Sequence, residues 1–311
     1  MLDLRIEGGT VADGKGGEPF TADVGVKDGR IVEISTRPSG SVARETVDAS
    51  GAWVMPGFVD IHTHYDGQAT WDPTFSPSVN HGVTTLVMGN CGVGFAPVRP
   101  GKEDGLVKLM EGVEDIPGAA LHEGIRWNWE SFPQYMDALD SEGRSLDYLV
   151  QVPHDPLRMY VMGERAVAKE VATPEDIAAM RALLREALEA GAAGFSSGRS
   201  DNHRTSEGKE TPAAEASAAE LTGIAQAFHG LRHGVVQMVS DFDLLQGPQR
   251  FDAEFDLVEQ LARAAGRPLS MTWLQRDPGG EQYQAIQARV EKAVAAGIPV
   301  IVLIGGANGC F

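Results

Sequence analysis

Residues 53–67 read Trp-Val-Met-Pro-Gly-Phe-Val-Asp-Ile-His-Thr-His-Tyr-Asp-Gly, and this stretch decides the fold that we predict. Its apolar run predicts a buried strand over Phe58–His64. Side chains two residues apart share one face of a strand, so Asp60, His62 and His64 should point the same way. Two imidazoles whose α-carbons lie about 7 Å apart, two strand steps, can converge on one metal ion.

The His-x-His tripeptide also has a purely structural interpretation. Eight histidines in 311 residues would give about 0.2 such pairs by chance, so the tripeptide alone does not define a site. Its position favours metal binding over a structural histidine pair. The two histidines end an apolar strand, which is where a barrel strand presents catalytic groups at its top face.

Short apolar stretches continue after His64 and alternate with helical ones. The further stretches with strand character are Val83–Met88, Leu146–Val152, Ala193–Ser197, Val235–Ser240, Leu269–Leu274 and Ile298–Ile304. With Phe58–His64 they make seven strands, and their alternation with helices indicates a parallel α/β barrel. A closed barrel of this type has eight strands. We therefore predict an incomplete TIM-like (β/α) barrel of about seven strands, truncated before strand eight.

Helix signals lie between these strands. Thr173 is an N-cap followed by Pro174 and two acids, and apolar residues at helical spacing continue to Leu188. Gly191 should end this helix. Ser217-Ala-Ala-Glu220 is a capping box that should open a second helix. Two more helices are predicted over Phe251–Ala265 and Gln282–Ala296.

The N-terminal part of the chain has a different pattern. Residues 2–53 alternate apolar and polar side chains, and Asp13-Gly14 and Asp28-Gly29 are turn signals. This pattern predicts short antiparallel strands joined as hairpins. We divide the chain into a small N-terminal β-subdomain, residues 1–53, which forms a β-sandwich portion, and a barrel domain, residues 54–311.

The composition excludes several classes of partner. Forty-four acidic and 26 basic residues give a formal charge of −18, which repels phosphate backbones and anionic membrane surfaces. We expect no nucleic-acid partner and no membrane association. The chain lacks a signal-peptide pattern and an apolar run of membrane-spanning length, so we predict a cytoplasmic protein. Two cysteines, Cys91 and Cys310, cannot make a disulfide framework. The sequence is compatible with a homo-oligomer.

Two motifs resemble a known family. Pro56-Gly-Phe-Val-Asp-Ile-His-Thr-His64 is similar to the first-strand signature of the amidohydrolase superfamily. Val87-Met-Gly-Asn-Cys-Gly-Val-Gly-Phe-Ala-Pro97 resembles the D-aminoacylase, or N-acyl-D-amino-acid deacylase, branch and is the more discriminating motif. The resemblance runs from the N-terminus to about Pro299. It implies a (β/α) barrel flanked by a small β-sandwich.

His62, His64 and Cys91 are the predicted metal ligands. They should lie at the ends of the neighbouring first and second strands. Imidazole and thiolate favour zinc over hard cations, and three protein ligands plus water are typical of a catalytic site. The resemblance implies the same three ligands, with one zinc ion or two. The alternative for Cys91 is a small buried residue.

A second set of candidates follows later strands. Asp66 is a candidate catalytic residue that orients a histidine through its free ring nitrogen, or else a solvated loop acid. His154 follows the third strand and is a candidate for binding the substrate acyl group or a reaction oxyanion. The alternative is a hydrogen-bonded loop residue. After the fourth strand, Arg199, His203 or Arg204 are candidates for binding a substrate carboxylate. The alternative for each of these three is a solvated polar loop.

The sequence also departs from the family pattern. D-aminoacylase-type sites usually add a histidine after strand five and another after strand six, but here these strands end in Val239-Ser-Asp-Phe242 and Thr272-Trp-Leu-Gln275. Asp241 is a possible oxygen ligand in their place. The resemblance also implies a general-base aspartate after strand eight, and that strand is missing. We therefore expect weak or no activity from this chain.

These observations favour a metal-dependent hydrolase that acts on carbon–nitrogen bonds other than peptide bonds. The resemblance implies an N-acyl-D-amino-acid deacylase that hydrolyses a linear amide with metal-activated water. One alternative is a cyclic-amide or other C–N hydrolase of the same superfamily, because His-x-His alone does not select a substrate. Another is a non-catalytic metal-binding or interaction fragment whose open barrel edge, Ile298–Ile304, pairs with another chain.

Overall fold

The computed structural model describes residues 1–38, 40–242, 248–273 and 282–304. The chain divides into two compact units, Met1–Phe58 and Val59–Phe311. Leu274, Gln275 and Cys310 lie outside the described residues. Among the helices that are described, none combines the length and the apolar character that crossing a bilayer requires.

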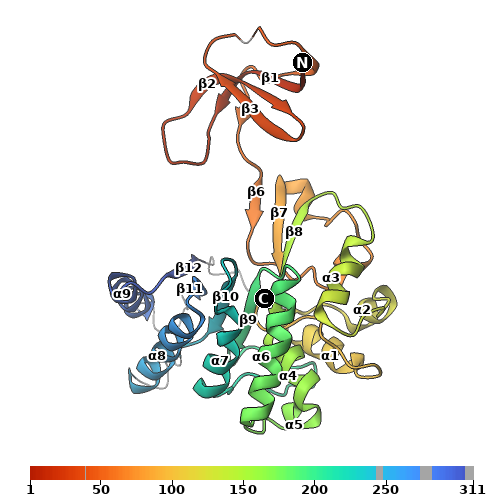
Figure 1. Ribbon diagram of the computed structural model, residues 1–311, viewed down its shortest axis with the longest axis vertical. Coiled ribbons are helices and arrows are strands. Elements are labelled where there is room, and N and C mark those ends of the chain that lie inside the picture. The colour runs from red at the N-terminus through yellow and green to blue at the C-terminus, as the bar shows by residue number, and fades with distance from the viewer. Residues whose placement is uncertain (39, 243–247, 274–281, 305–311) are drawn as a thin grey trace. The chain divides into compact units, whose positions relative to one another are not determined.

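The first unit is one small sheet (Figure 1). Its strands are β1 (Leu2–Val11), β2 (Phe20–Lys27), β3 (Arg30–Ser35), β4 (Ala43–Asp48) and β5 (Trp53–Val54). The order is β3-β2-β1-β4, and β5 also pairs with β1. The predicted hairpin at Asp28-Gly29 joins the antiparallel strands β2 and β3, and both turn residues have positive φ. The boundary expected at residue 53 would divide β5, which pairs with β1. The first unit instead continues past this strand to Phe58.

The second unit contains a seven-stranded sheet. Its strands are β6 (Phe58–Asp60), β7 (Val83–Met88), β8 (Asp147–Pro153), β9 (Gly194–Arg199), β10 (Val235–Ser240), β11 (Leu269–Trp273) and β12 (Val300–Ile304). They lie side by side in chain order, and the pairs from β7 to β12 are parallel. Helices separate successive strands, as in a (β/α) barrel. The predicted α/β class, with seven barrel strands and a separate small sheet, is confirmed.

The first barrel strand is shorter than predicted. β6 ends at Asp60, so His62 and His64 lie in the loop after the strand and do not share a strand face. The chain still contacts β7 at Thr63, whose backbone N–H and hydroxyl both donate to the Val87 carbonyl, at 3.0 and 2.7 Å. These two bonds anchor Thr63, the residue between His62 and His64, to the end of β7. Both histidines are therefore positioned beside that strand.

Nine α-helices and three short 3₁₀ helices connect the strands over the described residues. The α-helices are α1 (Glu103–Glu114), α2 (Gly118–Gly124), α3 (Phe132–Asp140), α4 (His154–Met162), α5 (Glu164–Val167), α6 (Pro174–Glu189), α7 (Ala218–Ala225), α8 (Pro248–Ala265) and α9 (Gln282–Ala295). The 3₁₀ helices are η1 (Gln68–Thr70), η2 (Ser78–His81) and η3 (Gln226–Phe228). Helices α4, α6, α7 and α8 contact one another in succession along the sheet (Figure 1).

The predicted helix starts at α6 and α7 are confirmed. The Thr173 side chain accepts a hydrogen bond from the Asp176 N–H, and the Asp176 side chain accepts one from the Thr173 N–H. The two bonds together form a capping box. Ser217 accepts from the Glu220 N–H at 3.2 Å. The carboxylate of Glu220, however, accepts a hydrogen bond from Arg158 of α4 at 2.8 Å. The Glu220 side chain therefore joins α7 to α4.

The core of the second unit lies between the strands and these helices. Met180, Leu184 and Leu188 of α6 are buried at helical spacing, as the sequence predicts. Met238 of β10 is also fully buried, so the sheet contributes to the same cluster. Removing water from this apolar surface supplies the main stabilisation of the unit.

The loop after β7 depends on glycine. Gly89 has φ +75°, and a Cβ atom there would lie 2.1 Å from the Gln151 carbonyl oxygen of β8. Cys91 and Gly92 follow with φ values of 58° and 78°. The backbone of this loop therefore packs directly against the next strand, and only glycine fits at position 89.

We predict that Gly89→Ala destabilises the chain by about 3 kcal/mol or more, because the left-handed backbone and the overpacking each cost energy. The matched control is Gly101→Ala. Gly101 has φ +79° but nothing within 4 Å of its Cβ position, so only the backbone cost of about 1 kcal/mol should remain. Urea unfolding of both variants measures the difference. Equal destabilisation would show that the close approach to Gln151 is unimportant.

Candidate metal centre

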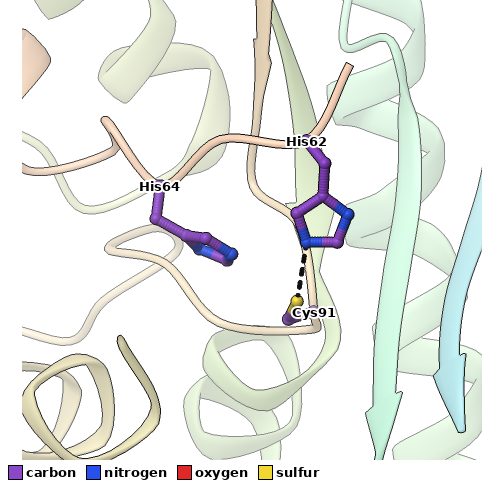
Figure 2. A group of neighbouring side chains, drawn as sticks. All are labelled: His62, His64 and Cys91. Carbon is purple, nitrogen blue, oxygen red and sulfur yellow. Dashed lines mark hydrogen bonds between the residues drawn. The ribbon is translucent and has the colours of Figure 1, made fainter. Parts of the chain in front are cut away.

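Three predicted ligands come together after the first two barrel strands. His62 and His64 follow β6, and Cys91 follows β7. Figure 2 shows the two imidazoles and the thiol turned toward one another. The His62 Nε2 and Cys91 Sγ atoms lie 3.0 Å apart, and one ligand atom from each of the three residues lies within 4.8 Å of the others. The two imidazole centroids are 5.5 Å apart.

Neighbouring strands fix the position of Cys91. The side-chain amide of Asn90 donates to the carbonyls of Thr63 and Val87, at 3.1 and 2.9 Å, and so ties the loop to the histidine segment. The Cys91 N–H donates to the Gln237 side chain of β10 at 3.1 Å. These bonds fix the backbone that carries the thiol against the histidine segment, β7 and β10.

Glu114 is a further member of the site that the sequence did not indicate. It is the last residue of α1, and its Oε1 lies 3.1 Å from Nε2 of His64. Burial, and then the nearby Asp66 and Asp115, raises the pKa of Glu114 to about 8. Burial, and then His62 and His203, lowers the pKa of His64 well below its ordinary value. Without a cation, this contact is thus a hydrogen bond between neutral groups at pH 7.

His203 joins the same site from the loop after β9. It was predicted as a substrate-binding residue, but Cys91, Glu114 and His203 form a second group whose ligand atoms lie within 4.8 Å of one another. Its Nδ1 atom is buried without a hydrogen-bond partner. Burial, with His62 adding to the effect and Asp241 opposing it, lowers the pKa of His203 to about 4. The ring is therefore neutral at pH 7, the state in which imidazole binds a metal.

Asp66 lies buried beside this cluster. Only 1% of the residue is exposed, and its Oδ2 atom has no hydrogen-bond partner. Burial raises its pKa to about 7, although backbone N–H groups including that of Gly89 oppose the increase. In this cluster, the carboxyl group that pairs with the ring of His64 is that of Glu114 and not that of Asp66.

The donor set fits a zinc ion. His62, His64 and Cys91 offer two imidazoles and a thiol, which are the ligand types that zinc prefers. The Nδ1 atoms of His64 and His203 are buried without hydrogen-bond partners, and burial raises the pKa of two nearby carboxyl groups, to about 7 for Asp66 and to about 8 for Glu114. A divalent cation would favour the deprotonated form of each of these groups.

His154 lies in a different setting from the one that the sequence suggested. It is the first residue of α4 and has no exposed surface. Its Nδ1 lies 3.0 Å from the Ser197 hydroxyl and its Nε2 lies 3.1 Å from Glu220, which also accepts from Arg158. Because both ring nitrogens have protein partners, His154 presents no free group to a substrate.

Arg199, the last residue of β9, and Arg204, in the loop after it, have different contacts. Arg199 makes two hydrogen bonds to Glu254, at 2.9 and 2.6 Å, and a third to the Ala216 carbonyl, so its guanidinium is committed to the fold. Arg204 is more exposed; it donates to the Asp201 carbonyl at 3.1 Å and lies 4.0 Å from Glu210.

Asp241, a possible replacement ligand, has a structural contact. Its carboxylate accepts from the Ser200 hydroxyl at 3.0 Å and from the Asp201 N–H at 2.6 Å. Neither candidate metal group within the described part of the chain includes it.

Comparison with known sequences gives consistent matches. A model of the amidohydrolase family matches residues 45–300. D-aminoacylase from Alcaligenes xylosoxydans xylosoxydans is 38% identical over 197 residues, which cover 63% of this chain and 38% of the relative. N-acyl-D-glutamate deacylase from the same organism is 34% identical over 226 residues, which cover 72% of this chain and 41% of the relative. The chain therefore spans about two fifths of the length of these relatives.

Solved structures give the same picture. A D-aminoacylase, described with a binuclear metal centre, matches with a TM-score of 0.78 and 29% identity, covering 98% of this chain and 58% of that one. N-acyl-D-glutamate deacylase from Bordetella bronchiseptica, complexed with zinc and a phosphonate inhibitor, matches with a TM-score of 0.73, 29% identity and the same coverage.

Asp155, next to His154, is a buried carboxyl group whose ionisation should make the free energy of unfolding depend on pH. It is fully buried, accepts from the Ala213 N–H at 2.6 Å and leaves its Oδ2 without a partner. Burial raises its pKa from 3.8 to about 7. The folded state thus retains a proton that the unfolded chain releases. The stabilisation from this group is complete below pH 3.8 and is lost as the pH rises through 7.

We predict that Asp155→Asn, which cannot ionise, removes this loss and flattens the pH dependence of unfolding between about pH 4 and pH 7. The two pKa values differ by about three, which corresponds to at most about 4 kcal/mol. Urea unfolding of the metal-free chain at several pH values measures the effect, with the exposed Asp137→Asn of α3 as control. Parallel curves for the wild type and Asp155→Asn would contradict the prediction.

Proposed function

Because this chain belongs to the amidohydrolase family, we propose that it is a metal-dependent hydrolase of the N-acyl-D-amino-acid deacylase type, which cleaves a linear amide C–N bond. The observation that supports this function is the convergence of His62, His64 and Cys91 after the first two barrel strands. The similarity to D-aminoacylase and N-acyl-D-glutamate deacylase supports the substrate class.

In this proposal, His62, His64 and Cys91 hold a zinc ion as neutral imidazoles and a thiolate. A cation bound in this way supplies Lewis-acid catalysis, by activating water and polarising the carbonyl of the amide. Asp66 is the proposed proton acceptor. Its carboxyl group is buried beside the site, it has an oxygen without a partner, and its pKa of about 7 suits proton exchange at neutral pH.

The substrate carboxylate needs a cationic partner. Arg204 is the better candidate, because the guanidinium of Arg199 already bonds Glu254 and the Ala216 carbonyl. Arg204 retains exposure; its Nε donates to the Asp201 carbonyl, and its only contact with a carboxylate among the described residues is the 4.0 Å approach to Glu210. An exposed guanidinium can bind a carboxylate through two parallel hydrogen bonds.

We predict that zinc binding depends on the three ligands. His62→Asn and Cys91→Ser should each lower zinc affinity by at least about tenfold, because even outer partners of ligands are worth that much. His81→Asn in η2 changes an exposed histidine and should have no effect. Equilibrium dialysis with elemental analysis measures bound zinc. Equal zinc content in all four proteins would contradict the assignment.

The substrate class has its own test. The zinc-loaded chain is incubated with N-acetyl-D-amino acids, their L enantiomers and a cyclic amide, and the released amino acid is measured by chiral chromatography. Release from the D substrates should exceed release from the L substrates at least about tenfold, a difference of about 1.4 kcal/mol, and chelation should stop it.

Two results would contradict this substrate assignment. One is faster hydrolysis of the cyclic amide, which would favour a cyclic-amide hydrolase. The other is a zinc-loaded chain that neither binds nor hydrolyses any N-acyl-D-amino acid, which would favour a non-catalytic metal-binding protein.

A further inference from the structure

A buried side-chain amide of β10 holds the backbone of Cys91. The Oε1 atom of Gln237 accepts a hydrogen bond from the Cys91 N–H at 3.1 Å, and only 2% of Gln237 is exposed. Strands β8 and β9 lie between β7 and β10 in the sheet. The bond therefore joins the loop after β7 to a strand that is not a neighbour of β7.

The backbone of Cys91 has a conformation that needs such support. Its φ is 58°, in the left-handed region that residues with a Cβ atom rarely adopt. Gly89 and Gly92 also have positive φ, but glycine adopts that region without a steric cost. A strained residue persists only where the surrounding structure holds it. The bond to Gln237 acts on the Cys91 backbone directly.

The same amide is costly to the fold. Its Nε2 atom is buried and has no hydrogen-bond partner among the described residues. A buried donor without a partner destabilises the folded state, and an apolar side chain of similar length would avoid that cost. Folding alone would therefore favour an apolar residue at position 237, and what the amide contributes is its bond to Cys91.

Gln151 of β8 provides a matched comparison. It is 3% exposed, its Nε2 donates to the Asn90 side chain at 2.9 Å, and its Oε1 is buried without a hydrogen-bond partner among the described residues. Gln151 and Gln237 are thus equally buried and bond to neighbouring residues of one loop. Only Gln237 bonds to the backbone of the residue that carries the thiol.

We propose that Gln237 is a positioning residue of the metal centre, which keeps the Cys91 backbone left-handed and so directs the thiol toward His62. This inference rests on the proposed metal centre of His62, His64 and Cys91. Nε2 of His62 and Sγ of Cys91 lie 3.0 Å apart. Without the bond to Gln237, Cys91 can relax to a negative φ, which changes the direction in which its Cβ and sulfur atoms point.

The experiment is a titration of the metal-free full chain and its variants with Co²⁺. Bound metal is measured by elemental analysis after dialysis, and the near-ultraviolet thiolate-to-cobalt absorption reports the bond to Cys91. Gln237→Met has a similar length and no acceptor oxygen. It should lower cobalt affinity by at least about tenfold and reduce the absorption per bound ion to that of Cys91→Ser. Cys91→Ser sets the baseline because Cys310 also has a thiol.

Two further variants separate positioning from a general structural effect. Gln237→Glu keeps an acceptor oxygen in either protonation state and should retain the thiolate absorption. Gln151→Met removes an equally buried amide and should also retain it, whatever its effect on the free energy of unfolding. Circular dichroism of each metal-free variant checks the fold. Should Gln237→Met fail to fold, Gln237→Asn withdraws the oxygen by one methylene and should likewise lose the absorption.

The outcomes separate this inference from the proposed function. Wild-type absorption in Gln237→Met, or an equal loss in Gln151→Met, would overturn the role of Gln237 and leave the metal centre intact. A loss in Gln237→Met that Gln237→Glu shares would also overturn it, because the acceptor oxygen would then not hold Cys91. A wild type whose absorption does not exceed that of Cys91→Ser would overturn the metal centre and this inference with it.

Discussion

The structure depends on the burial of ionisable groups around one thiol. Three imidazoles, two carboxyl groups and Cys91 lie together with little exposure, and burial shifts the pKa values of His64, His203, Asp66 and Glu114 toward their neutral forms. Such a cluster is costly unless a compensating charge is present. A divalent cation is the simplest group that satisfies the buried nitrogens and allows the carboxyl groups and the thiol to ionise.

The fold supplies this cluster through close backbone packing. Gly89 approaches Gln151 of β8, and Gly198 of β9 approaches Cys91, so the loop after β7 lies directly against the backbones of β8 and β9. Asn90 and Thr63 connect the same loop to the histidine segment. The three predicted ligands therefore come from segments whose relative positions are set by strand pairing and by close packing at glycine.

Much of the fold could be predicted from local sequence. β7 and β10 have the predicted bounds, and Thr173 and Ser217 begin α6 and α7, because short apolar runs and capping residues act locally. Helices α1, α2 and α4 have no side-chain cap hydrogen bond, so they lacked that signal. His62 and His64 were predicted as ligands because they end an apolar stretch, and Cys91 because it follows the next one; the structure brings the three side chains together although β6 ends before His62. Glu114 was not, because its position beside His64 depends on how α1 packs, which no residue spacing reveals.

The most direct measurement of the central claim is X-ray absorption at the zinc edge of the zinc-loaded chain. We expect one sulfur neighbour at about 2.3 Å together with nitrogen or oxygen neighbours at about 2.0–2.1 Å. Cys91→Ser should remove the sulfur contribution. A spectrum that contains only nitrogen and oxygen neighbours in the wild type would contradict zinc binding by the thiol of Cys91.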